Sequence, residues 1–355
     1  MNTYYVQYHS RTAAALATRD RQQTLPRDLW EFNFPQLAAK VVLTDSIKSS
    51  DRVNLHTGLN IIVHLKGSSV EDVNGLSKNF AEMLLNLVTF STLAFCDAAK
   101  LVSLIDATGK ETWPAMFYNY STEGKEVVPS LRVIDQNHFG EVFEAYDKSP
   151  DQERVSRALS WLRKGINQHD SVDEFICYWT GLEVIRHFFR RDPRFIRGKK
   201  GDGWDGIKDI FTKELGTTDF DLIKGVRIGL FHGKRELDNT FVQEIGTYRE
   251  PLRKGLIFCI GRLLNITNAS IMAVVNRIPK RIPLEPWTLF KGTLKDLPSD
   301  FDELVKNYPL IAMEKVEKQF AIDPQGNLSV TFKTPHRFNL PKGGKFNAQS
   351  IEYWG

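Results

Sequence analysis

The sequence predicts an α+β N-terminal domain, an all-α helical bundle after it, and a short β-hairpin tail at the C-terminus. Three observations support this. Strand-like segments alternate with one long helical pattern before residue 148, helical periods dominate from 149 to 276, and two strand-like runs flank a turn near the end. The predicted divisions are therefore 1–148 (α+β), 149–276 (helical) and 277–355 (extended linker and hairpin).

The N-terminal part contains short runs of β-branched and aromatic residues, each bounded by residues that form turns. Such runs are typical of strands. They lie at Val41–Thr44, Leu59–Leu65, Ala115–Tyr120 and Leu131–Ile134. Between about Val70 and Asp106 the apolar residues recur at helical spacing, so we expect one long helix packed on a small sheet.

A proline and polar cluster at Asp147–Asp151 marks the predicted domain boundary. Amphipathic helices are predicted after it, because apolar residues then recur every three or four positions. They cover Val155–Ile166, Val172–Phe189, Ile207–Glu214, Asp221–Leu230 and Ile245–Ile266, the last with a kink or a fresh start at Pro251. Helices of this number and length can close around one core.

The residues after 276 lose the helical pattern. Three prolines in Arg277–Trp287 indicate an extended linker. Further on, Lys318–Ile322 and Leu328–Lys333 flank a turn sequence, which predicts a hairpin that pairs with a sheet, for instance that of the N-terminal domain.

The composition is that of an ordinary soluble protein, with 42% hydrophobic and 25% charged residues and a net charge of +4. Residues 1–150 hold 14 Lys and Arg against 17 Asp and Glu, and residues 151–355 hold 33 against 26, so the basic excess is C-terminal. Such an excess permits a polyanionic partner without requiring one.

The three cysteines, Cys96, Cys177 and Cys259, are widely spaced in apolar stretches, which indicates small buried residues rather than a metal or redox pair. We expect a cytoplasmic location, because the N-terminus lacks the apolar core of a secretion signal. The apolar run Leu84–Cys96 is too short and too polar for a membrane span, which favours a buried helix and no membrane partner.

An arginine five positions before a histidine is the sharpest candidate for chemistry. Arg227 and His232 lie at helical spacing, so both side chains can meet near one face. RNA cleavage without metal needs a base for the 2′-hydroxyl and a cation for the phosphorane, roles that suit His and Arg. Arg132 to His138 and Arg163 to His169 have similar spacing, but only His232 is followed by a glycine and a long helix.

The succession of segments 156–168, 173–185 and 226–234, followed by a long helix, resembles HEPN domains over about a third of the chain. The resemblance implies a helical bundle, a homodimer through it, and a composite ribonuclease site with Arg227 and His232 that leaves a 2′,3′-cyclic phosphate. It also implies a place in bacterial toxin–antitoxin or antiviral defence, with a regulatory partner. Active members commonly have a polar residue after the arginine, where this chain has Ile228, so a catalytically inactive binding or dimerising module is the alternative.

Structural interpretations of the same residues stay open. His232 can be a histidine that interacts with the end of a helix, with Gly233 capping the turn. Arg227 can be a structural arginine that bridges to Glu183 or Asp221. Glu183 is the third candidate site residue, either orienting His232 or pairing with Arg227, and it can equally be a carboxylate at the edge of the core.

Residues 186–200 combine seven Lys and Arg with three phenylalanines and one acid. Interleaved cations and aromatic rings suit a single RNA strand, whose phosphates and bases they contact. The alternative is a set of core phenylalanines with solvated cations. The RNA-contact candidates are Arg186, Arg190, Arg191, Arg194, Arg197, Lys199 and Lys200.

The sequence lacks the glycine-rich phosphate loop, the dinucleotide fingerprint, the nucleophile elbow and the spacings of metal sites. We therefore expect no cofactor and no metal. A role as an accessory protein of a metabolic pathway is a third, less favoured interpretation.

Overall fold

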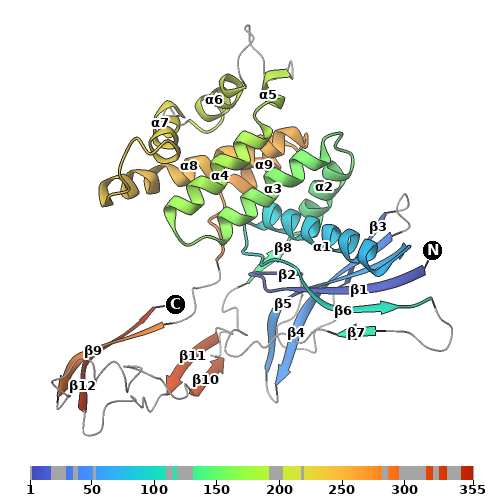
Figure 1. Ribbon diagram of the computed structural model, residues 1–355, viewed down its shortest axis with the longest axis horizontal. Coiled ribbons are helices and arrows are strands. Elements are labelled where there is room, and N and C mark those ends of the chain that lie inside the picture. Colours follow the sequence, from blue (N-terminus) through green and yellow to red (C-terminus); the bar gives the residue numbers. More distant parts are fainter. Residues whose placement is uncertain are drawn as a thin grey trace. The chain divides into compact units, whose positions relative to one another are not determined.

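The computed structural model describes residues 2–16, 29–34, 39–50, 53–108, 115–117, 131–191, 203–216, 220–281, 287–295, 317–322, 328–333 and 345–354. Two compact units divide the chain, Met1–Ile282 and Pro283–Gly355. The first unit contains an antiparallel sheet and then a series of helices (Figure 1). The finer division at residue 148 stays a prediction.

The N-terminal sheet is antiparallel throughout, with strand order β3-β4-β5-β1-β6-β7. Alternate residues of β1 are buried, among them Tyr4, Val6 and Tyr8, as expected where one face of a sheet is covered. The strands are β1 (Asn2–Ser10), β3 (Leu29–Phe34), β4 (Ala39–Ser50), β5 (Val53–Gly67), β6 (Lys100–Asp106) and β7 (Ala115–Phe117).

The four predicted strand segments fall on strands of this unit. Val41–Thr44 lies in β4, Leu59–Leu65 in β5, and Ala115–Tyr120 begins with β7, its last three residues lying outside the described part. The fourth segment becomes β8 (Arg132–Ile134), which pairs in parallel with β2 (Ala14–Leu16).

Helix α1 (Val70–Thr92) packs on β1 and β5, and the Ser69 hydroxyl caps its start by accepting from the Asp72 backbone N–H at 3.2 Å. The prediction that this helix continues to Asp106 was wrong. The chain leaves the helix at Leu93, which adopts a left-handed conformation with φ of 51°, and residues 100–106 form β6. A short apolar run such as Leu101–Ile105 fits the period of a strand as well as that of a helix.

Residues 84–94 are buried in the core, as the sequence predicted for this apolar segment. In the part of the chain that the structure describes, no helix has the length and apolarity needed to cross a membrane.

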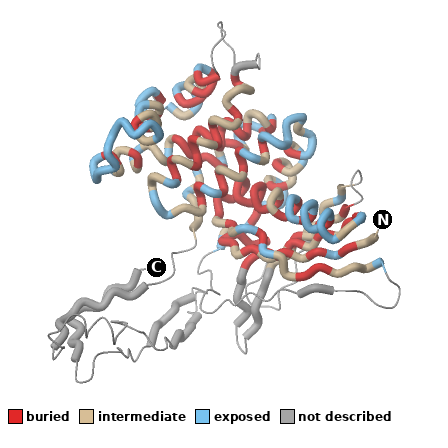
Figure 2. Tube along the Cα trace, viewed as in Figure 1, coloured by how far each residue is buried: buried red, intermediate tan, exposed pale blue. Residues whose placement is uncertain are grey.

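The helical segments that follow pack around one core, in which α4 contacts both α3 and α8, with buried residues along all three (Figure 2). Gly255 of α8 permits a close approach to α6, because a Cβ there would lie 2.0 Å from the Phe211 ring. The helices are α3 (Gln152–Asn167), α4 (Ser171–Ile185), α5 (Phe188–Arg191), α6 (Trp204–Lys213), α7 (Phe220–Phe231), α8 (Asn239–Leu263) and α9 (Asn268–Val275).

Two predicted helices differ in their ends. The helix expected to reach Phe189 ends at Ile185, and a turn separates it from α5. The last long helix begins at Asn239, where Asp238 caps it, and continues through Pro251 without a break. A proline removes one helical hydrogen bond, and the neighbouring packing of Leu252 and Leu256 compensates for that loss.

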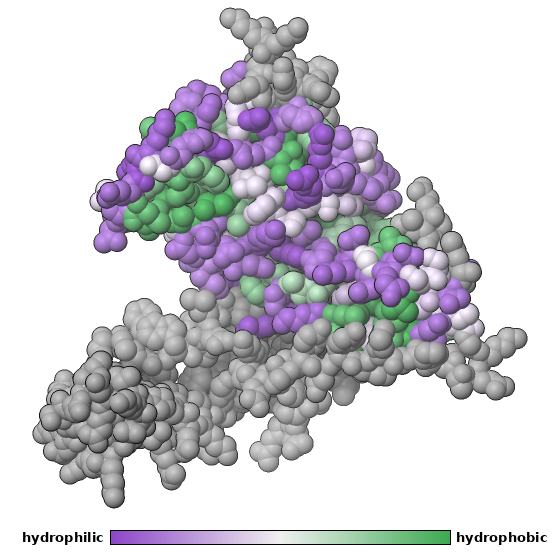
Figure 3. All heavy atoms as spheres, in the orientation of Figure 1, coloured by the Kyte–Doolittle hydropathy of each residue, from purple (hydrophilic) through white to green (hydrophobic). Residues whose placement is uncertain are grey.

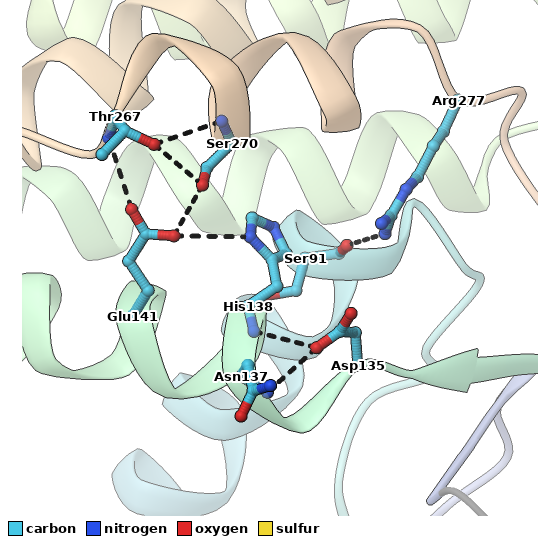
Figure 4. Close-up of polar contacts among 8 residues, drawn as sticks. All are labelled: Ser91, Asp135, Asn137, His138, Glu141, Thr267, Ser270 and Arg277. Carbon is cyan, nitrogen blue, oxygen red and sulfur yellow. Dashed lines mark hydrogen bonds and ion pairs between the residues drawn. The ribbon is translucent and has the colours of Figure 1, made fainter.

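Helix α2 (Gln136–Asp147) was not predicted, and it joins the N-terminal elements to α9 (Figure 4). Its Glu141 carboxylate accepts from the Thr267 backbone N–H at 3.3 Å and from the Ser270 hydroxyl at 2.6 Å, so it caps the start of α9. His138 Nδ1 lies 3.8 Å from the same carboxylate. Beside it, Arg277 donates to the Ser91 carbonyl.

The stability of this junction is expected to fall at acidic pH because of His138, whose side chain is 11% exposed. Burial, with Arg277 adding to it, lowers the pKa of His138 below 6.5. As the pH falls, the unfolded chain therefore binds a proton at His138 at a higher pH than the folded protein does. The contribution of the neutral imidazole to the free energy of unfolding is complete above pH 6.5 and is lost as the pH falls below that value. Denaturant unfolding at about pH 7.5 and about pH 5.5 measures the loss.

The variant His138→Gln is the matched comparison, since it keeps a side chain of similar size without the titration. We expect its loss of stability on acidification to be smaller than that of the wild type. Equal losses in the two proteins would contradict the role of His138. The remaining loss includes His169, whose pKa burial also lowers.

The interpretation of the cysteines as small buried residues is confirmed. Cys96, Cys177 and Cys259 are free thiols inside the first unit. Burial raises the pKa of Cys96 and of Cys177 to about 11 and raises that of Cys259 further. Thiols of this kind are poor nucleophiles at neutral pH.

Two antiparallel strand pairs lie in the described residues of the second unit. β10 (Glu317–Ile322) pairs with β11 (Leu328–Lys333), and β12 (Lys345–Trp354) pairs with β9 (Trp287–Lys295). The predicted pairing of the tail with the N-terminal sheet stays a prediction.

Candidate functional site

Helix α7 presents Arg227 and His232 at its C-terminal end. Ile223, Val226 and Gly229 face the core, and this spacing leaves Arg227 on the outer side of the helix. The helix ends in a Schellman turn, in which Gly233 has φ of 59° and the Lys234 N–H donates to the Gly229 carbonyl at 3.1 Å. His232 is therefore the C-terminal cap residue, exposed beside the end of the helix.

The two side chains are in direct contact. Arg227 Nη1 donates to His232 Nε2 at 3.0 Å. Because a guanidinium only donates, Nε2 must carry the lone pair, and the proton of the neutral imidazole lies on Nδ1. This neutral form can accept a proton from a hydroxyl group at Nε2, when the hydroxyl replaces the Arg227 N–H at that nitrogen and the guanidinium turns to the phosphate.

Glu183 of α4 binds the second terminal nitrogen, Nη2, of the Arg227 guanidinium. Arg227 Nη2 donates to Glu183 Oε1 at 3.0 Å, and the indole of Trp179 donates to the same oxygen at 2.8 Å. Of the two structural partners that the sequence allowed for Arg227, the structure has Glu183; Asp221 pairs with Lys208 instead. The carboxylate thus holds Arg227 in one orientation toward His232.

The cluster is open to solvent on one side. The side chains of Arg227 and Glu183 are 24% and 34% exposed. Phe231 is 42% exposed, and the centre of its ring lies 5.0 Å from the guanidinium carbon of Arg227. Among the described residues, no partner accepts from the buried Nε of Arg227.

Only one of the three Arg–His spacings becomes a contact. Arg132 donates to the carbonyls of Thr92 and Ile278, and Arg163 pairs with Glu82. Their sequence partners His138 and His169 are not bonded to them. The structure therefore brings together the pair that the sequence context favoured, Arg227 and His232.

The basic segment is described only in part. Arg186 is the C-terminal cap residue of α4, with its guanidinium carbon 5.1 Å from the Trp204 ring centre. Arg190 and Arg191 belong to α5. Arg194, Arg197, Lys199 and Lys200 lie outside the described residues.

Two members of the cluster were not among the predicted site residues. Trp179 lies four residues before Glu183, and Phe231 four residues after Arg227. The i,i+4 spacing on a helix was the available signal in both cases. Neither spacing distinguishes a site residue from a core residue by itself.

In the described ranges, no three His, Cys, Asp or Glu side chains come together as metal ligands. The Arg227 cluster itself offers a proton acceptor beside a fixed guanidinium.

Comparison of the chain with protein-family models, with curated proteins and with solved structures gives no match.

Proposed function

We propose that this protein is a metal-independent endoribonuclease of the HEPN class, acting on single-stranded RNA. One observation carries the proposal. The guanidinium of Arg227 contacts both the exposed imidazole of His232 and the carboxylate of Glu183, which orients it. Toxin–antitoxin or antiviral defence and a regulatory partner are proposed on the resemblance alone. A cytoplasmic location is part of the proposal, since free thiols suit a reducing compartment.

His232 acts as the base in this proposal. It takes the proton of the 2′-hydroxyl, the 2′-oxygen attacks the adjacent phosphorus, and the bond from phosphorus to the 5′-oxygen breaks. The 5′-oxygen takes a proton from solvent and leaves as a hydroxyl, the protonated His232 returns its proton to solvent, and the other product carries a 2′,3′-cyclic phosphate. No water is consumed in this step.

Arg227 offsets the negative charge that builds on the phosphorane oxygens. A donor oriented before the reaction is effective because it needs no rearrangement during the step. Glu183 is a positioning residue, since it contacts the guanidinium and not the imidazole. The guanidinium has further N–H groups beyond those bonded to Glu183 and His232, and they are available to a phosphate.

The proposal is tested by incubating the full chain with a labelled single-stranded RNA, with and without a chelator. A DNA of the same sequence is the matched control, because it lacks the 2′-hydroxyl nucleophile. We expect RNA cleavage that the chelator leaves unchanged and no DNA cleavage. RNA binding without cleavage would instead support the inactive binding module, and cleavage that stops in chelator would overturn the mechanism.

The proposed active form is a homodimer through the helical region. Leu222 and Phe231 of α7 and Leu237, which follows it, are 55%, 42% and 59% exposed, and Figure 3 shows hydrophobic surface where Figure 1 places α7. Apolar surface of this kind beside a polar cluster is typical of an interface.

We expect Leu237→Glu to convert a dimer into a monomer in light-scattering measurements, because a charge would then be buried at the contact. Val133→Glu is the control, since Val133 of β8 is 56% exposed and lies on a different element. A monomeric wild type, or a dimer in both variants, would count against this interface.

A further inference from the structure

A second arginine–histidine pair lies at a junction where the start of α3 meets the turn that follows the end of α4. Arg154, in the first turn of α3, contacts the imidazole of His187, with Nη1 3.3 Å from Nδ1 and closer to Nε2. The ring of Phe188 stacks on that of His187, with centres 5.0 Å apart and planes inclined by 17°. The guanidinium carbon of Arg154 lies 5.3 Å from the centre of the Phe188 ring.

The cations at this junction have no carboxylate partner in the part of the chain that the structure describes. Among the ion pairs that the described residues form, none includes Arg154 or Arg186, although other arginines such as Arg163 and Arg262 have acidic partners. Glu153 precedes Arg154, but neighbouring residues of a helix do not face each other. The two guanidinium groups instead lie against aromatic rings, those of Phe188 and Trp204.

Helix α4 connects this junction to the Arg227 site. Glu183, which bonds Arg227, lies four residues before His187, and the backbone at Arg186 is still helical. His187 lies in the turn that directly follows α4, so the chain between Glu183 and His187 rises by about one helical turn. The junction is therefore about one helical turn from the carboxylate that orients the proposed catalytic arginine.

We propose that Arg154, Arg186 and the stacked rings of His187 and Phe188 form a subsite for a nucleotide of single-stranded RNA next to the Arg227–His232 pair. The subsite rests on the proposed function, which it extends by placing the neighbouring nucleotide. Unneutralised guanidinium groups bind a phosphate, and an aromatic pair offers a platform for an unpaired base. A base within a duplex is already stacked and does not use such a platform, so a single strand is selected.

The test is RNA binding measured by fluorescence anisotropy with a labelled single strand of about 12 nucleotides, within the span of single-strand-binding surfaces. The parent protein carries His232→Ala, so that the RNA stays intact. We expect Phe188→Leu to weaken binding about tenfold, through the loss of base stacking. We expect Arg154→Ala to reduce the slope of log affinity against log salt by about 0.7, the value for one phosphate contact on a single strand.

The matched control is Lys164→Ala. Lys164 is an exposed cation of the same helix that also lies over an aromatic ring, 4.2 Å from the centre of Trp161, and it is about 15 Å further along α3. Its loss should leave the salt slope unchanged. Arg154→Lys should keep the slope, because it retains the charge.

The subsite would be overturned if Arg154→Ala and Phe188→Leu had the same RNA affinity and the same salt slope as the parent protein. It would also be overturned if the parent bound no RNA. The proposed nuclease activity is judged separately, by cleavage with His232 present. Binding that depends on Arg154 in a protein that cleaves nothing would support the subsite and reject the nuclease.

Discussion

Replacing His232 with alanine is expected to slow the cleavage of single-stranded RNA by about 10²- to 10⁴-fold, the usual contribution of a general base. The substitution removes the only imidazole that contacts Arg227 among the described residues. Single-turnover cleavage of a labelled RNA in the presence of chelator measures the effect. The free energy of unfolding should change little, because His232 is exposed at the end of α7.

His169→Ala is the control for this substitution. His169 is also exposed and also follows an arginine at similar spacing, but Arg163 pairs with Glu82. We expect its cleavage rate to match that of the wild type. Equal rates for His232→Ala and wild type would remove His232 from the mechanism.

Replacing Trp179 with alanine is expected to lower the free energy of unfolding by about 3–5 kcal/mol, the usual cost of removing a large buried aromatic side chain. Trp179 is 1% exposed, and its ring lies 4.7 Å from that of Trp204 and 6.2 Å from that of Phe220. These rings join α4 to α6 and α7, so the cavity would loosen the support of Arg227. Denaturant unfolding measures the change.

Trp179→Phe separates packing from hydrogen bonding. It keeps an aromatic ring in the cluster but removes the N–H that donates to Glu183. We expect a smaller loss of stability than with alanine, together with slower RNA cleavage. A shift below about 1 kcal/mol for Trp179→Ala would show that the aromatic cluster does not stabilise the helical segments.

The helical part of the fold was predictable because each helix buries one side. The apolar spacing of α3, α6 and α7 therefore marks these helices closely. The same signal is present in α2, where Phe139, Val142 and Tyr146 are buried behind the cap residue Asp135, but three apolar positions in a helix this short are a weak helical pattern. The prediction of a helix over β6 was wrong because an apolar run of that length fits the period of a strand as well as that of a helix.

The candidate site was predictable only where its members are close in sequence. Arg227 and His232 share a helix, and the glycine that ends the helix distinguished them from two similar spacings. The contact of Glu183 with Arg227 spans 44 positions and depends on how α4 and α7 pack. The contact of Arg154 with His187 spans 33 positions, so no spacing rule identifies it.

The identity of the newly formed RNA ends tests the central claim most directly. A single-stranded RNA cleaved by the wild type in chelator, with its products resolved by mass spectrometry, should yield a 2′,3′-cyclic phosphate and a 5′-hydroxyl. A substrate with one 2′-deoxy sugar at the cleaved position should stay intact there. A 5′-phosphate product, or cleavage at the deoxy position, would contradict a mechanism in which His232 activates the 2′-hydroxyl beside Arg227.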